Sequence, residues 1–135
     1  VFHLNIDDLE SKKNYNGWKA YSKSKFLNIL FTYYLSMKLE GNIVCNCLSP
    51  GFIDSDFGNN NKGAFRIFIK IIKKVLAKST EKGAKTILYM ALNKNLSTTT
   101  GKFFQNCKVK KTSKKTYDKD LMKFIWELSL NYTKS

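Results

Sequence analysis

Tyr21 and Lys25 are the residues of this sequence whose types and spacing best suit chemistry. They lie four positions apart in Tyr21-Ser-Lys-Ser-Lys25, so in a helix the phenol and the ammonium share one face, about 5–6 Å apart at Cβ. A tyrosine ordinarily loses its proton near pH 10, and moving that pKa to about 7 requires about 4 kcal/mol of preference for the phenolate. A nearby cation supplies part of this preference. The pair is therefore a candidate for proton transfer.

The spacing alone is not specific, because about one Tyr-x-x-x-Lys is expected by chance in a chain with this many tyrosines and lysines. The sequence contains three such pairs: Tyr15 with Lys19, Tyr21 with Lys25, and Tyr34 with Lys38. Only the second pair begins a strongly periodic helical pattern that is followed, at helix length, by a strand and Pro50-Gly51. We interpret the other two pairs as structural.

The elements that must position this pair are predicted from periodicity and turn residues. We expect helices over 18–39, 62–78, 80–93 and from about 118 onward, strands over 43–48 and 101–104, and loops over 1–17, 52–62 and 108–116. Gly41 is the expected C-cap of the first helix. A long helix that leads into a buried strand predicts an α/β layer. In open α/β sheets ligands bind beyond the carboxyl ends of strands, where Ser49-Pro50-Gly51 is expected to lie.

Composition limits the class of protein. The chain has 135 residues, a net charge of +14 and 43% apolar residues, which predicts one globular domain. Residues 62–115 hold 15 basic residues and 1 acidic residue, and so carry the whole excess charge. The three cysteines have neither CxxC nor Cys-His spacing, which favours no metal site and a reducing compartment. No stretch approaches the about 20 apolar residues of a membrane span.

Five motifs in order along the chain resemble the short-chain dehydrogenase/reductase family, and more closely its retinol dehydrogenase branch. They are Tyr15-Asn-Gly-Trp-Lys-Ala-Tyr-Ser-Lys-Ser-Lys25, Leu48-Ser-Pro-Gly51, Glu81-Lys-Gly-Ala-Lys-Thr86, Gly101-Lys-Phe-Phe-Gln-Asn-Cys107 and Trp126-Glu-Leu-Ser129. The resemblance implies an α/β fold that is the C-terminal part of a Rossmann-type doubly wound parallel sheet. It also implies hydride transfer between NADP or NAD, with NADP favoured, and a hydrophobic alcohol, aldehyde or ketone.

The resemblance assigns roles to individual residues. Tyr21 is the expected general acid/base, and Lys25 is expected to lower the pKa of its phenol and to bind the ribose hydroxyls. Pro50 and Gly51 shape the turn that meets the nicotinamide, and the backbone of Ile53 is expected to donate to the carboxamide. Ser55 stands where the family usually has Thr and keeps the same hydrogen-bonding capacity.

The family's glycine-rich dinucleotide loop and catalytic Ser have no counterpart in this sequence. We therefore expect residues 1–135 to be a single partial domain that lacks the N-terminal cofactor-binding half and is inactive by itself. The alternative is a non-catalytic truncated fragment that acts as a membrane-surface or interaction module.

The basic segment at 62–78 is the basis for the expected partners. Its apolar residues lie opposite lysines and arginine, a pattern typical of an interfacial helix, so an anionic membrane surface competes with a plain helix beside the substrate entrance. Nucleic acid is disfavoured because no helix-turn-helix or zinc-ligand pattern accompanies the charge. The family resemblance also implies a second copy of the chain as a partner, in a homodimer. It implies a location in the cytoplasm or on the cytosol-facing side of the endoplasmic reticulum membrane.

Overall fold

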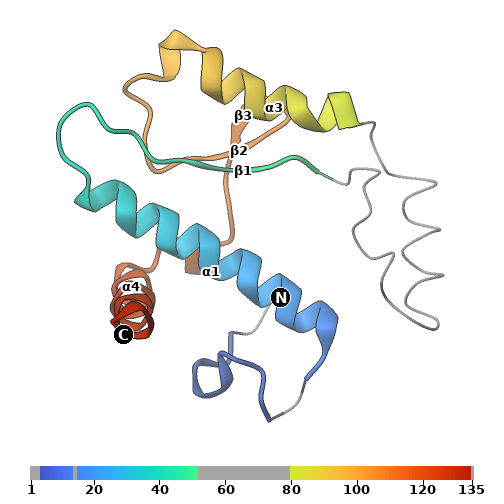
Figure 1. The fold of residues 1–135 in the computed structure, drawn as a ribbon, viewed down its shortest axis with the longest axis vertical. Helices are drawn as coiled ribbons and strands as arrows, with labels where there is room; N and C mark the ends of the chain where they lie inside the picture. Colours follow the sequence, from blue (N-terminus) through green and yellow to red (C-terminus); the bar gives the residue numbers. More distant parts are fainter. Residues whose placement is uncertain (1–3, 14, 52–79, 135) are drawn as a thin grey trace.

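A computed structural model describes residues 4–13, 15–51 and 80–134 of the chain (Figure 1). The expected helix at 62–78 and the predicted cofactor contacts Ile53 and Ser55 lie outside the described residues. The elements in chain order are η1 (Ile6–Asp8), α1 (Gly17–Lys38), β1 (Cys47–Ser49), α3 (Thr80–Leu92), η2 (Lys94–Leu96), β2 (Phe103–Gln105), β3 (Lys108–Lys110), η3 (Lys114–Tyr117) and α4 (Lys119–Thr133), where η marks a 3-10 turn.

The three strands form one small mixed sheet in the order β1-β2-β3. β1 pairs parallel to β2, with Cys47 opposite Phe103, and β2 pairs antiparallel to β3. Figure 1 shows α3 on one side of this sheet and α1 on the other, with α4 beyond α1. The predicted α/β class is confirmed, and the layering fits a part of a Rossmann-type doubly wound sheet.

β2 joins the two helical layers because successive side chains of a strand point to opposite faces. Phe104 is 1% exposed, and its ring centroid lies 6.4 Å from that of Tyr89 in α3. Phe103 points the other way and packs against the core cluster between α1 and α4. Two adjacent phenylalanines therefore bury apolar surface on both faces of the sheet.

The core beneath the sheet is formed by α1 and α4. Leu30 and Tyr33 of α1 pack against Met122 and Ile125 of α4. The Trp126 ring of α4 lies beside α1, with its centroid 5.0 Å from that of the Phe31 ring. The helix ends match local signals, because the side chains of Asn16 and Asp118 accept hydrogen bonds from the first turns of α1 and α4.

Several predicted boundaries are wrong. The predicted strand 43–48 is observed as Cys47–Ser49, because Ile43 and Val44 are exposed and the backbone N–H of Cys45 donates to the Thr100 hydroxyl rather than to a strand. The predicted strand 101–104 is shifted to Phe103–Gln105. Helix α1 ends at Lys38 with Leu39 as its C-cap, so Gly41, at φ +69°, belongs to the following turn.

The predicted loop at 108–116 contains β3 and η3 instead. Asn106 and Cys107 both have positive φ, +52° and +58°, and this conformation reverses the chain tightly between β2 and β3. The three residues of β3 are exposed, so no apolar alternation in the sequence announces this strand.

Candidate active site

The helical side of the candidate site is formed by the second and third turns of α1, which carry Tyr21 and Lys25. The Lys25 ammonium lies 5.3 Å from the centroid of the Tyr21 ring, so the cation and the aromatic ring share one face of the helix as the spacing predicts. Tyr21 is 39% exposed, which leaves part of the ring accessible to a ligand.

The strand side of the site is the turn that follows β1. Gly51 has φ +84°, a left-handed conformation that glycine adopts without steric cost. Its backbone N–H donates to the Ser49 hydroxyl at 3.3 Å, which holds the turn directly after the strand. The conformation explains why a glycine is suited to this position.

These two parts meet in a hollow of about 690 Å³ between α1 and β1, called here the α1–β1 hollow. Its walls are formed by Tyr21, Lys25, Asn28, Ile29, Phe31, Thr32, Cys47, Leu48, Ser49, Pro50, Gly51 and Phe103. Four of the predicted site residues, Tyr21, Lys25, Pro50 and Gly51, are thus brought together by the fold. Their roles in catalysis and cofactor binding stay predictions.

Sequence reasoning missed two polar residues of the hollow, Asn28 and Thr32. They follow Tyr21 and Lys25 at helical spacing, so that positions 21, 25, 28 and 32 line one face of α1. Side chains with polar groups at successive spacings of four, three and four residues are the signal in the sequence that could have revealed them.

Cys47 is a further wall residue that sequence reasoning did not select. Burial raises the pKa of its thiol to about 11, and the neighbouring Cys45 adds to the shift. The thiol is therefore protonated at neutral pH and contributes an uncharged, weakly polar surface to the hollow.

The other two Tyr-x-x-x-Lys pairs do not line the α1–β1 hollow. Lys38 lies 5.5 Å from the Tyr34 ring centroid, a contact of the same kind as that of Tyr21 and Lys25. Tyr15 is 76% exposed and precedes α1. The Tyr21–Lys25 and Tyr34–Lys38 pairs thus differ in their position relative to the α1–β1 hollow and not in their local geometry.

The residues of the hollow fit the nicotinamide end of a dinucleotide. The α1 side offers the Lys25 ammonium, the strand side offers the Ser49 hydroxyl, and both sides contribute apolar side chains against which a flat ring can pack. Among the described residues, no group of three or more His, Cys, Asp or Glu side chains could hold a metal ion.

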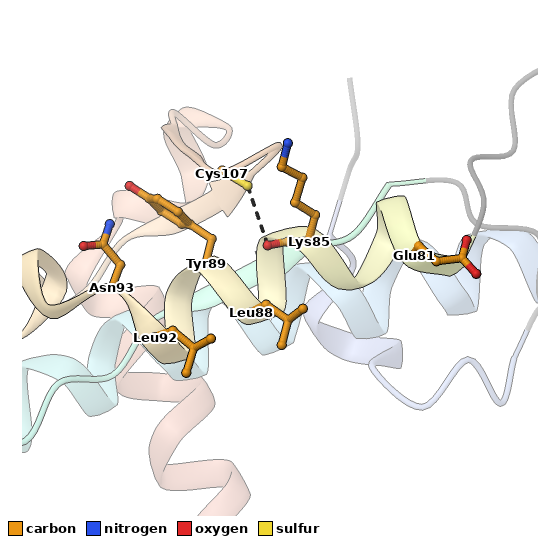
Figure 2. Close-up of a pocket in the computed structure, with 7 residues that line it drawn as sticks. All are labelled: Glu81, Lys85, Leu88, Tyr89, Leu92, Asn93 and Cys107. Carbon is orange, nitrogen blue, oxygen red and sulfur yellow. Dashed lines mark hydrogen bonds between the residues drawn. The ribbon is translucent and has the colours of Figure 1, made fainter.

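A second hollow of about 680 Å³ runs along the exposed side of α3. Figure 2 shows Leu88 and Leu92 pointing to one side of the helix, and Lys85 and Tyr89 pointing to the other. The Cys107 thiol lies 3.7 Å from the Lys85 carbonyl oxygen, to which it donates.

No helix in the described ranges has both the length and the apolar character needed to cross a membrane.

Known proteins match nearly the whole chain. Retinol dehydrogenase 14 of Homo sapiens is 31% identical over 129 residues, which are 93% of this chain and 38% of that protein. Polyprenol dehydrogenase of Homo sapiens is 33% identical over 136 residues, 98% of this chain and 41% of that protein. The short-chain dehydrogenase TIC 32 A, chloroplastic, of Brassica napus is 33% identical over 133 residues, 96% of this chain and 41% of that protein. No known family profile matches.

The chain therefore belongs to the short-chain dehydrogenase/reductase family, a family of oxidoreductases. Within that family it is retinol dehydrogenase-like, as the motifs around Tyr21, Pro50 and Gly101 predict. The chain spans about two fifths of the length of the curated relatives that it matches.

Proposed function

We propose that this chain is the proton-transferring, C-terminal part of an NAD(P)-dependent dehydrogenase that acts on an apolar alcohol, aldehyde or ketone. The observation that carries the proposal is the α1–β1 hollow, in which the Tyr21 and Lys25 side chains face the Pro50-Gly51 turn at the end of β1. A phenol beside an ammonium, at the carboxyl end of a strand, is an arrangement suited to proton transfer to a substrate oxygen.

In the proposed reaction the Tyr21 hydroxyl gives its proton to a carbonyl oxygen, or its phenolate takes one from an alcohol. The nicotinamide, when bound, supplies or accepts the hydride. The Lys25 ammonium stabilises the phenolate and donates to the ribose hydroxyls. The Pro50-Gly51 turn holds the ring edge, and Ile53 and Ser55 are proposed to donate to the carboxamide.

The proposed substrate class follows from the walls of the hollow. Ile29, Phe31, Leu48 and Phe103 contribute apolar surface, whereas the polar groups lie along the helix face and the turn. An apolar substrate with one oxygen function matches this division, because its oxygen can reach Tyr21 while its hydrocarbon part leaves water.

The carrier is proposed to be NADP rather than NAD, on the family resemblance. The sequence contains no glycine-rich GxGxxG loop. Such loops bind the pyrophosphate of a dinucleotide through backbone N–H groups, so we expect this chain alone to bind the cofactor weakly.

The test is Tyr21→Phe in the protein expressed from its complete coding sequence. Loss of the acid/base should lower kcat by about 10²–10⁴-fold, while NADPH binding followed by fluorescence is unchanged. Tyr34→Phe is the matched control, because Tyr34 makes the same contact with Lys38 but does not line the α1–β1 hollow. Full turnover in Tyr21→Phe would falsify the assignment.

A second candidate is the non-catalytic module that binds an anionic membrane surface, and α3 favours it. Leu88 and Leu92 are 55% and 74% exposed, and Lys85 is exposed on the same helix. A helix with exposed apolar side chains on one side and a cation on the other suits the boundary of an anionic bilayer. Vesicles of phosphatidylserine and phosphatidylcholine should then sediment the chain, and Leu88→Ser/Leu92→Ser should weaken this binding. Equal binding to neutral vesicles would contradict the charge argument.

A further inference from the structure

One buried side chain, that of Lys23, connects the beginning of α1 to the N-terminal segment. Among residues 17–25, only Lys23 is buried, with 9% of its surface exposed. Residues advance by about 100° per position in an α-helix, so Lys23 points about 160–200° away from Lys25 and Tyr21. The same two turns therefore present the Tyr21–Lys25 pair on one side and Lys23 on the other.

The Lys23 ammonium donates two hydrogen bonds to a turn of the N-terminal segment. Its acceptors are the main-chain oxygen of Asp8, at 2.5 Å, and the hydroxyl of Ser11, at 2.8 Å. Ser11 is 8% exposed and has φ +57°, and its own N–H donates to the same Asp8 oxygen. Both acceptors are neutral oxygens, so this buried cation is held by directed hydrogen bonds.

The turn that receives Lys23 is itself fixed to the core and to α4. The Asp8 carboxylate accepts from the backbone N–H of Lys12 at 2.7 Å, which closes the turn. Leu9 packs against the core cluster. Glu10 accepts a hydrogen bond of 2.6 Å from the Tyr132 hydroxyl near the end of α4. Through these contacts Lys23 is connected to the side of the molecule opposite the α1–β1 hollow.

Buried apolar packing is absent from the first turns of α1. The buried apolar residues that this helix contributes to the core, Leu30 and Tyr33, lie further along it, and none of residues 17–25 is a buried apolar residue. Trp18 and Tyr21, the aromatic residues of its first turns, are 43% and 39% exposed. Hydrogen bonds depend steeply on direction, so the two bonds of Lys23 define the rotation better than these partly exposed rings can.

We propose that Lys23 is a positioning residue, which fixes the rotation of the first turns of α1 so that Tyr21 and Lys25 face the Pro50-Gly51 turn. The catalytic part of this inference rests on the proposed function. The geometric part concerns the chain alone and can be measured without turnover.

The first experiment measures by NMR how close the Tyr21–Lys25 face of α1 lies to the Pro50-Gly51 turn in the 135-residue chain. A nitroxide label on Lys25→Cys, with the three native cysteines replaced by serine, should broaden the amide signal of Gly51, because both positions line the α1–β1 hollow. In Lys23→Met, which keeps the apolar stem, this broadening should fall by at least half, and Lys23→Arg should restore part of it. Lys19→Met, which removes an exposed lysine of the same helix, should leave it unchanged. Unchanged broadening in folded Lys23→Met overturns the proposal.

If Lys23→Met does not fold, as judged by circular dichroism, Ser11→Gly replaces it. This variant removes one acceptor of the ammonium and suits the positive φ of residue 11. It should reduce the same broadening of the Gly51 amide signal, and unchanged broadening would again overturn the proposal.

The second experiment measures steady-state kinetics in the protein expressed from its complete coding sequence. A misplacement of about 1 Å at a reacting group lowers turnover by up to about 10²-fold. We therefore expect kcat of Lys23→Met to fall by at least about 10-fold and the KM for NADPH to rise, because the proposed ribose contact of Lys25 is displaced together with Tyr21. Unchanged kcat contradicts the proposal. If the unmutated protein has no turnover, the proposed function fails while the NMR result still decides the role of Lys23.

Discussion

Gly101 lies where the connection from η2 enters β2, and its replacement by alanine tests how closely the sheet approaches α1. It has φ +64°, and its N–H donates to the Cys45 oxygen at 2.8 Å. A Cβ added at this position would lie 2.6 Å from the Ser36 hydroxyl oxygen and 3.5 Å from the Ser36 Cβ. Gly101→Ala therefore meets both backbone strain and a steric overlap with α1.

The expected loss of stability has two parts. A left-handed conformation costs a residue with a Cβ about 1–2 kcal/mol. The Ser36 hydroxyl must rotate away, which breaks its 2.7 Å hydrogen bond to the Tyr33 carbonyl oxygen and costs about 1 kcal/mol. We expect Gly101→Ala to lower the free energy of unfolding by about 2–3 kcal/mol.

Urea unfolding followed by circular dichroism measures this loss, and Gly41→Ala is the matched control. Gly41 has φ +69° but nothing within 4 Å of an added Cβ, so its replacement should cost only the backbone part, about 1–2 kcal/mol. In Ser36→Ala/Gly101→Ala the overlapping oxygen is absent, so the double variant should be more stable than the sum of the single effects predicts, by about 1 kcal/mol. Equal losses in Gly101→Ala and Gly41→Ala, together with additivity in the double variant, would refute the reasoning.

Three further predictions concern thiol reactivity, alkaline stability and helix capping. Burial raises the pKa of Cys47 to about 11, so its alkylation by iodoacetamide should accelerate tenfold per pH unit up to about pH 11, and a plateau near pH 9 would contradict this. Burial also raises the pKa of Tyr33 to about 12. Tyr33 therefore ionises at lower pH in the unfolded chain than in the folded chain. Its contribution to the free energy of unfolding is complete below about pH 10 and is lost as the pH rises toward 12. Tyr33→Phe should remove this part of the alkaline loss in urea titrations. Asn16→Ala should cost about 1 kcal/mol, because the Asn16 side chain accepts from the Lys19 N–H at 3.0 Å, and the exposed Asn42→Ala should cost almost nothing in the same measurement.

The helices were predictable because their signals are local. Asn16 and Asp118 cap α1 and α4, and the apolar residues of each helix recur at three and four positions. The shared face of Tyr21 and Lys25 follows from the same local geometry. The family motifs extended this prediction to the α/β class and to the turn after β1.

The strands were less predictable because a strand exists only through its partner. β3 has three exposed residues, and its assignment depends on pairing with β2 across the tight turn at Asn106. β1 is shorter than its apolar run, because the backbone at Cys45 bonds to the Thr100 hydroxyl and not to a strand residue. The pairing of β1 with β2 is therefore decided by residues more than fifty positions away, whereas β3 depends on the tight turn that follows β2.

The sequence by itself determined which groups could do chemistry, since helical spacing sets Tyr21 beside Lys25 whatever the remainder of the chain does. Only the tertiary structure decided that this pair, and not Tyr34 with Lys38, meets the Pro50-Gly51 turn. It also decided that Lys23, one lysine among many in the sequence, is buried and holds the N-terminal turn. The reason is physical: spacing along one helix is set by covalent geometry, whereas contacts between elements depend on how their surfaces pack.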